Sequence, residues 1–114
     1  MVLYRALMHI NEPGKSDLVL NELENLIQDM EGESLEVELL ANSDGVLLYL
    51  KQPNPRVDRL TNLRAHGVRF TVCSHSLQTR AISREMLLPI VEIVNSGVGE
   101  IVRRQTDGYA YIKL

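Results

Sequence analysis

The single cysteine of the chain, Cys73, lies in the segment GVRFTVCSHSLQ and is followed by Ser74, His75 and Ser76. The apolar run before it predicts a strand, and the polar residues after it indicate the start of a helix. The first turn of a helix has unpaired N–H groups and a partial positive charge, and both stabilise a thiolate over a thiol. Cys73 is therefore a candidate nucleophile with a lowered thiol pKa, and His75 could add a charge or a proton.

A second interpretation of Cys73 stays open. Free cysteine is among the most buried residue types and often only fills space in a core. A lone cysteine also has no second thiol in its own chain that could resolve a mixed disulfide, which disfavours a self-contained disulfide oxidoreductase. The residues around the thiol thus allow either a reactive group or a packing residue.

The elements that would position Cys73 are an alternation of strands and helices. Strands are predicted over residues 3–10, 35–41, 68–73, 90–94 and 109–114, and helices over 15–30, 57–65, 77–88 and 97–105. Residues 46–50 fit either a strand or a helix. Strands that are apolar almost throughout, separated by helices, are typical of a mostly parallel sheet covered on both faces. We therefore predict one three-layer α/β domain over residues 1–114, with a sheet of five strands.

Polar segments follow four of these strands, at residues 11–14, 42–45, 73–76 and 95–97. Because ligands bind beyond the carboxyl ends of parallel strands, the four segments could converge on one pocket. The candidate pocket residues are Asn11, Asn42, Ser43, Gly45, Ser74, Ser76, Ser96 and Gly97.

The sequence predicts neither a metal site nor a cofactor site. His9 lies near the end of the first strand and could reach the same edge, although a core or hydrogen-bonded role is favoured. His66 precedes the third strand, at the opposite edge, so we predict no metal site. No glycine-rich dinucleotide fingerprint follows the first strand, so nucleotide or flavin binding ranks last and no cofactor is predicted.

Composition excludes several classes of protein. The chain has 114 residues, 45% of them hydrophobic, and a net charge of -3, which argues against non-specific nucleic-acid binding. No apolar run is long enough to span a membrane and no signal peptide is recognisable, so we expect no membrane partner. A single cysteine indicates a reducing, cytoplasmic location. The acidic stretch 22–38 is expected to be exposed surface. Arg80, Arg84, Arg103 and Arg104 could steer an anionic or acidic partner, although a solvated helix face is the favoured interpretation.

Three segments in this order carry a resemblance to a known family: ELLANSDGVLLYLK, GVRFTVCSHSLQ and VEIVNSGVGEIVRRQTDGYAYIKL. The most specific features are the cysteine after the third strand, the Ser96-Gly97-Val98 turn with Glu100 behind it, and the ending QTDGYAY. These features resemble the DsrE/DsrF-like proteins, which are associated with intracellular sulfur transfer and oxidation. Residues 35–114 carry most of the similarity, and residues 3–30 fit more loosely.

The resemblance implies a flavodoxin-like fold and assembly into oligomers, often trimers or hexamers. In the sulfur-relay members a cysteine carries sulfur as a persulfide, and Cys73 is at the corresponding position. The leading hypothesis is therefore a sulfur carrier or sulfurtransferase-like protein that exchanges sulfur with donor and acceptor proteins. The alternative is a non-catalytic oligomeric module that binds a small anion or a partner protein, with Cys73 buried.

Overall fold

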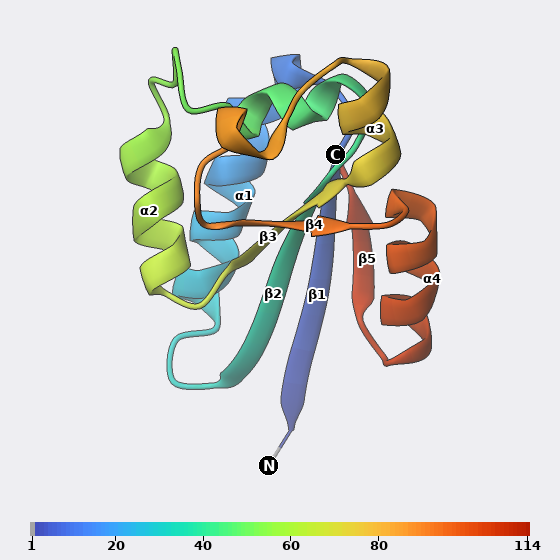
Figure 1. The fold of residues 1–114 in the computed structure, drawn as a ribbon. Coiled ribbons are helices and arrows are strands. Elements are labelled where there is room, and N and C mark those ends of the chain that lie inside the picture. Colours follow the sequence, from blue (N-terminus) through green and yellow to red (C-terminus); the bar gives the residue numbers. More distant parts are fainter. Residues whose placement is uncertain (1) are drawn as a thin grey trace.

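The computed structural model describes residues 2–114, in which five parallel strands form one sheet with helices on both faces (Figure 1). The strands are β1 (Leu3–Ile10), β2 (Ser34–Ala41), β3 (Arg69–Cys73), β4 (Val91–Val94) and β5 (Ala110–Lys113). The helices are α1 (Ser16–Asp29), α2 (Val57–Ala65), α3 (Ser74–Thr79) and α4 (Gly97–Thr106), joined by the 3-10 turns η1 (Pro13–Lys15), η2 (Ser43–Tyr49) and η3 (Arg84–Met86). The predicted three-layer, flavodoxin-like α/β fold is confirmed.

Two segments differ in detail from the prediction. Residues 46–50, which fitted either a strand or a helix, lie mostly in the 3-10 turn η2. The helix predicted over residues 77–88 is two pieces, of which α3 begins directly after Cys73. Ala81, with φ of 53°, is in the left-handed region and prevents α3 from continuing into η3.

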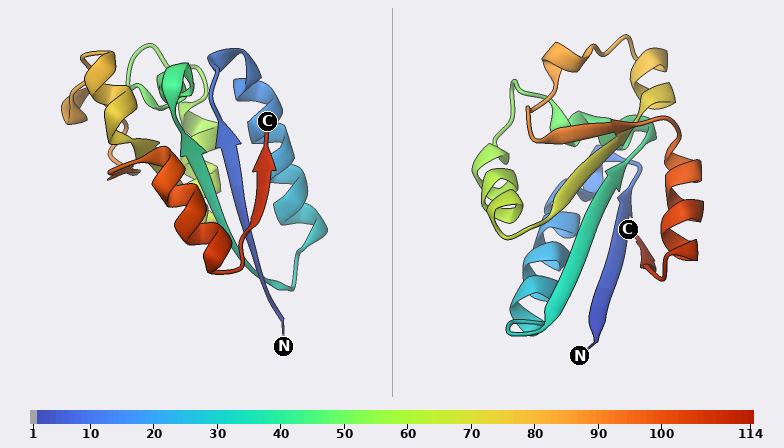
Figure 2. Two further views of the ribbon diagram at one scale, coloured as in Figure 1. Left: turned by 90° about the vertical axis from the view of Figure 1, so that its right-hand side faces the viewer. Right: turned by 60° about the horizontal axis from the view of Figure 1, so that its bottom comes forward.

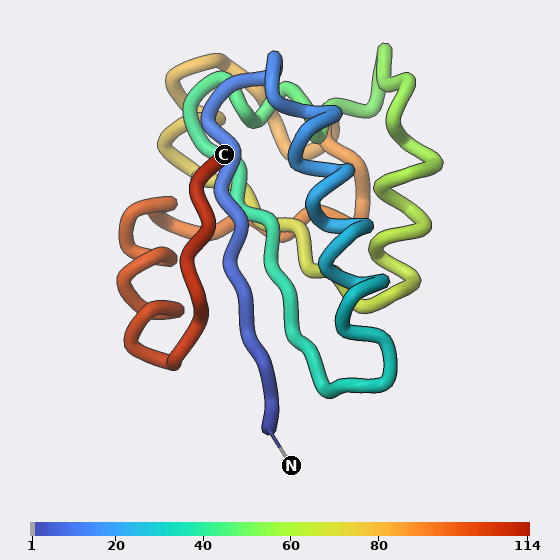
Figure 3. Tube along the Cα trace, turned by 180° about the vertical axis from the view of Figure 1, so that it is seen from behind, coloured from blue at the N-terminus to red at the C-terminus, as the bar shows by residue number. Residues whose placement is uncertain are grey.

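Helix α4 lies alone on one face because of the strand order, which is β4-β3-β2-β1-β5. From β1 to β4 the chain steps across the sheet in one direction, and right-handed connections then all lie on the same face. The connection from β4 to β5 steps back across the sheet, so its helix lies on the opposite face. Figure 2 shows α1 and α4 on opposite sides of the sheet, and Figure 3 shows the return path from behind.

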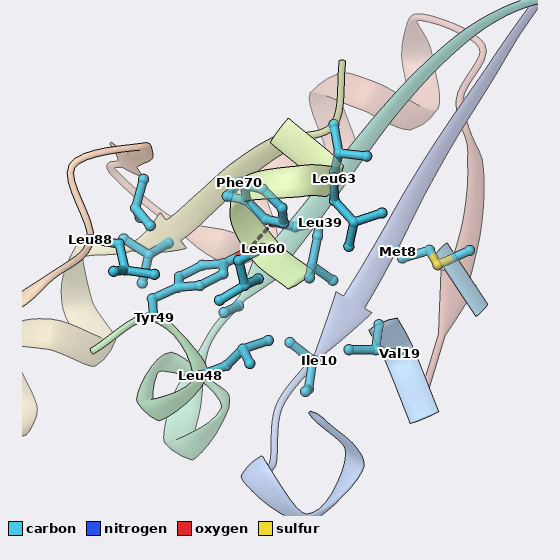
Figure 4. Packing of buried hydrophobic residues seen from close by; sticks show 14 of the residues in the cluster. Met8, Ile10, Val19, Leu39, Leu48, Tyr49, Leu60, Leu63, Phe70 and Leu88 are labelled. Atoms are coloured by element: carbon cyan, nitrogen blue, oxygen red, sulfur yellow. Dashed lines mark hydrogen bonds between the residues drawn. The ribbon is translucent and has the colours of Figure 1, made fainter. Parts of the chain in front are cut away.

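The face under α1 and α2 holds the main apolar core (Figure 4). Alternation along β2 and β3 points Leu39, Phe70 and Val72 into this core. Tyr49 of η2 packs edge-on against Phe70, and its hydroxyl donates a 2.6 Å hydrogen bond to the Leu39 carbonyl. The core therefore fixes the carboxyl-end turn η2 as well as the two helices.

The face under α4 combines a small apolar cluster with buried polar side chains, which corrects one prediction. Glu38, in the acidic stretch expected to be solvent-exposed, is only 1% exposed and lies beneath α4. The Thr71 hydroxyl donates to Glu38 over 2.7 Å, and Arg104 Nε donates to Glu38 over 2.9 Å and to Glu100 over 3.1 Å. Arg104 was also expected on a solvated surface. These four side chains form a buried polar cluster that attaches α4 to the sheet.

The two carboxyl groups of this cluster share a proton. Burial and the hydrogen bond to Glu100 together raise the pKa of Glu38 to about 7, against the opposing effects of the Thr71 hydrogen bond and the Arg104 charge. Burial alone would raise the pKa of Glu100 as well, but the hydrogen bond from Glu38 and the charge of Arg104 bring it below its usual value. Glu38 is therefore the protonated partner, and it donates to the Glu100 carboxylate.

This cluster predicts a pH-dependent stability. A raised pKa stabilises the folded state while the group is protonated, so this contribution is complete below the ordinary value of 4.5 and disappears as pH rises through about 7. Between about pH 5 and pH 8, the free energy of unfolding should fall by about 1–3 kcal/mol more in the native protein than in Glu38→Gln. Denaturant unfolding across this range measures the difference.

The matched control is Glu33→Gln, which changes an exposed carboxylate of the same acidic stretch. It should follow the native pH profile. Identical profiles for the native protein and Glu38→Gln would show that Glu38 carries no raised pKa.

Candidate functional site

The candidate site lies where β1, β2 and β3 end, on the face of the sheet that α4 covers. Alternation along the strands places His9 and Cys73 on this face, and Asn42 follows the last residue of β2. The pairing of β3 with β4 brings the start of α4 beside them, because Cys73 lies opposite Val94. Segments that are far apart in the sequence thus meet around the thiol.

Gly97, the first residue of α4, is packed against Cys73 and Asn42. A Cβ atom at position 97 would lie 3.4 Å from the Cβ atoms of both neighbours, closer than most such contacts. The absence of a side chain lets the peptide backbone approach the thiol, and the Gly97 N–H donates a hydrogen bond to the Cys73 sulfur. Ser96 caps the same helix, because its hydroxyl accepts a 3.1 Å hydrogen bond from the Gly99 N–H.

Ser76 supplies two further donors to the sulfur, its backbone N–H and its hydroxyl. The hydroxyl oxygen accepts a 2.8 Å hydrogen bond from the Ser43 N–H. With an N–H directed at its oxygen, the Ser76 hydroxyl is free to direct its proton at the Cys73 sulfur. The turn after β2 therefore orients a donor that belongs to α3.

Two opposing effects act on the pKa of the Cys73 thiol. Burial raises it, since Cys73 is only 7% exposed. The hydrogen bonds from the Ser76 hydroxyl and from the N–H groups of Gly97, Ser76 and His75 together outweigh burial and bring the pKa below its usual value. The site therefore favours the thiolate, which is the nucleophilic form of cysteine.

His9 lies at the same edge in a hydrogen-bonded chain with Tyr111 and Asn42. Its Nδ1 is 2.7 Å from the Tyr111 hydroxyl and its Nε2 is 2.7 Å from Oδ1 of Asn42. Burial lowers the pKa of His9, and the charge of Lys113 acts in the same direction against the opposing hydrogen bond to Asn42. The hydrogen-bonded role expected for His9 is confirmed, and at neutral pH its ring is uncharged.

Hydrogen bonds from Arg80 hold the turn after β2 against α3. Its guanidinium donates to Asp44 Oδ1 over 2.9 Å, to the Ser43 hydroxyl over 3.3 Å and to the Ser76 carbonyl over 3.1 Å. Ser43 has φ of 51°, an unfavourable backbone conformation for a residue with a side chain, so it needs such external support. Arg80, expected only on a solvated helix face, therefore has a structural role.

The remaining predicted pocket residues make their contacts elsewhere. Asn11 accepts a hydrogen bond from Lys113, and Gly45 lies so close to the Ile10 carbonyl that a side chain would collide with it. Ser74 Oγ accepts a 3.4 Å hydrogen bond from Gln78, and the His75 side chain is exposed. Of the predicted set, the structure brings Asn42, Ser76 and Gly97 to Cys73, and His75 contributes through its backbone N–H.

The sequence analysis missed Tyr111, which belongs to the site through the pairing of β5 with β1. The register places Leu7 opposite Tyr111 and His9 opposite Lys113. Nothing in the sequence alone indicates that the last strand returns to the first. The QTDGYAY ending was noted only as part of a resemblance.

Within residues 2–114, no helix is both long and apolar enough to cross a membrane. In the same part of the chain, no cluster of three or more His, Cys, Asp or Glu side chains could hold a metal ion.

The Ser76 hydroxyl predicts a specific change in thiol reactivity. Ser76→Ala removes one donor to the Cys73 sulfur, so the pKa of the thiol should rise and alkylation by iodoacetamide at neutral pH should slow severalfold. Intact-mass measurement of alkylation across pH gives both the rate and the apparent pKa. Ser74→Ala is the control, because that hydroxyl faces Gln78. Equal profiles for the two variants would contradict the role of Ser76.

Comparison with known proteins places the chain in a family. Residues 2–114 match the DsrE/DsrF-like family. The chain is similar to MTH1491, a protein of unknown function from Methanobacterium thermoautotrophicum, with 37% identity, a TM-score of 0.90, and coverage of 97% of this chain and 99% of that one. It shares its fold with the ychN protein from E. coli, at 20% identity and a TM-score of 0.66 over 99% and 100% of the two chains.

A search among curated proteins found no significant match. The family match spans nearly the whole chain and includes β1 and α1, where the resemblance was looser. The chain belongs to the DsrE/DsrF-like family.

Proposed function

We propose that this protein is a sulfur carrier in which Cys73 accepts and donates sulfane sulfur as a persulfide. The observation that carries the proposal is the set of donors around the Cys73 sulfur, which come from the starts of α3 and α4 and from the Ser76 hydroxyl. A thiolate is the nucleophile in sulfur exchange, and the same donors stabilise it again as a leaving group. Membership of the DsrE/DsrF-like family supports this chemistry.

The reaction needs only one thiol from this chain. The Cys73 thiolate attacks the outer sulfur of a donor persulfide, R–S–SH, so that a new S–S bond forms at Cys73. The S–S bond of the donor breaks, and R–S⁻ leaves with the electron pair, while the proton stays on the transferred sulfur. An acceptor thiolate then attacks that outer sulfur and releases Cys73 as a thiolate. No external oxidant or reductant takes part in either step.

The partners in this proposal are thiol-bearing donor and acceptor molecules that approach the carboxyl edge of the sheet. The recessed position of Cys73 limits the approach to a narrow group such as a cysteine side chain or a small persulfide. A free thiol of this kind persists in a reducing compartment, so we place the protein in the cytoplasm.

We extend the proposal to self-association of this chain into a trimer or hexamer. Helix α4 packs on the sheet through Gly97 and Glu100, and its outer side presents Val98 and Val102, which are 67% and 60% exposed. A stripe of aliphatic residues on one helix is the type of surface that a second copy of the same chain would cover.

A rival function is favoured by the low exposure of the thiol. With Cys73 only 7% exposed, the residue could be a packing group in an oligomeric module that binds an anion or a partner protein. The two functions differ in one property, the reactivity of Cys73 in the folded chain.

The direct test is sulfur loading of the native protein by glutathione persulfide, measured by intact mass. We expect a gain of one sulfur atom in the native chain, its removal by a reductant, and no gain in Cys73→Ser, which lacks the nucleophile. A thiol that accepts sulfur only after denaturant is added would overturn the carrier function and support the packing role.

Self-association has its own test, which is the molar mass in dilute solution by light scattering. The native chain should be an oligomer, and Val98→Lys combined with Val102→Lys should reduce it to monomers, because two charges would be buried unpaired at the contact. Leu18→Lys is the matched control, since Leu18 is exposed on α1, across the sheet from α4. A monomeric native chain would contradict the proposal.

A further inference from the structure

The sulfur exchange described above leaves three hydrogen-bonded side chains at the site unused. Tyr111, His9 and Asn42 come from β5, β1 and the turn after β2, and their polar atoms form a chain with two contacts of 2.7 Å. His9 in the middle of the chain is buried, whereas Tyr111 at one end is 37% exposed. Hydrogen bonds on both ring nitrogens of a buried histidine restrict the orientation of their partners.

The chemistry of the two contacts decides where each proton lies. Oδ1 of Asn42 can only accept, so Nε2 of His9 must carry the ring proton and donate it. Because burial keeps the ring neutral, Nδ1 has no proton and accepts from the Tyr111 hydroxyl. The chain therefore runs in one direction, from the Tyr111 O–H through His9 to the Asn42 amide oxygen.

With its oxygen held by His9, Asn42 presents its NH₂ group toward Gly97. A Cβ atom built on Gly97 would lie 3.5 Å from Nδ2 of Asn42 and 3.4 Å from the Cβ atom of Cys73. Among residues 2–114, no acceptor is hydrogen-bonded to this nitrogen, and it is not one of the donors to the Cys73 sulfur. A free donor thus lies close to Cys73 without contacting Sγ.

We propose that Asn42, oriented by Tyr111 and His9, binds the outer sulfur atom of the Cys73 persulfide. This inference rests on the proposed carrier function and assigns the residue that binds the transferred sulfur atom. The outer sulfur extends about 2 Å beyond Sγ. Asn42 follows Ala41, which pairs with Val72, so its side chain is a neighbour of Cys73 and its unused amide donor is the group we assign to that sulfur. An N–H donor stabilises the anionic persulfide and holds its outer sulfur in place for an acceptor thiolate.

His9 holds the amide oxygen of Asn42 by donating its Nε2–H to Oδ1. In the neutral ring, the Tyr111 hydroxyl donates to Nδ1 and so keeps the ring proton on Nε2. His9 and Tyr111 are therefore positioning residues, and Asn42 is the group that contacts the transferred sulfur.

The experiment compares glutathione persulfide loading in the native chain, Asn42→Asp and Tyr111→Phe. Asn42→Asp keeps an acceptor for His9 but replaces the donor with a negative charge, so the loading rate should fall about tenfold or more. Tyr111→Phe removes the proton that fixes the His9 tautomer, and loading should fall severalfold although Tyr111 does not touch Cys73. Tyr4→Phe, an exposed tyrosine on β1, should load at the native rate.

Two readouts separate this inference from the carrier function. Nitrogen NMR of His9 should show the Nε2–H tautomer in the native chain and a mixture in Tyr111→Phe, and the pKa of the Cys73 thiol should rise in Asn42→Asp. If the native chain accepts no sulfur, the carrier function fails, and the binding of the transferred sulfur by Asn42 fails with it. The tautomer of His9 and the pKa of Cys73 still show in that case whether the Asn42 amide is oriented as inferred. A native Nδ1–H tautomer, or native loading rates in both site variants, would overturn the inference.

Discussion

The close approach of the Gly97 backbone to Cys73 is the contact on which the site depends. It brings an N–H donor from α4 to a sulfur that already has donors from the start of α3, and it packs the same glycine against Asn42. Such an approach requires α4 to lie on the face of the sheet to which Cys73 points. The strand order meets this requirement, because the return from β4 to β5 places α4 there and the earlier connections on the other face.

The two faces of the sheet consequently have different roles. The face under α1 and α2 buries a continuous apolar core, which supplies most of the stability of the fold. The face under α4 has a small apolar cluster of Leu7, Leu40 and Tyr109, with the Glu38–Glu100–Arg104 group beside it. Buried charged groups contribute little net stability, but their hydrogen bonds require a specific arrangement of the elements that carry them. We therefore interpret this group as the interaction that sets the position of α4 on the sheet.

The sequence predicted the fold well because its signals are local. Apolar runs, glycines and turn residues marked nearly every strand and helix, and the position of Cys73 at the end of a strand followed from the same pattern. The local environment of Cys73 was also predictable, since the start of a helix places N–H groups near the preceding residue. His75 shows the limit of this reasoning, because only its N–H reaches the sulfur while its side chain faces solvent.

The parts that could not be predicted depend on pairing between distant segments. Tyr111 reaches His9 only because β5 pairs with β1, and Glu38 is buried only because α4 crosses above β2. In the sequence, Glu38 is one of seven acidic residues between positions 22 and 38 and has no local feature that separates it from its exposed neighbours. Long-range topology, and not residue type, decides which of these side chains enters the site.

The most direct measurement is the ionisation of Cys73 in the folded protein and in denaturant, followed by the ultraviolet absorbance of the thiolate. We predict a lower pKa for the folded thiol than for the unfolded one, because the N–H and hydroxyl donors around the sulfur outweigh its burial. An equal or higher pKa in the folded protein would mean that burial dominates. Cys73 would then be a packing residue, and the site would have no nucleophile.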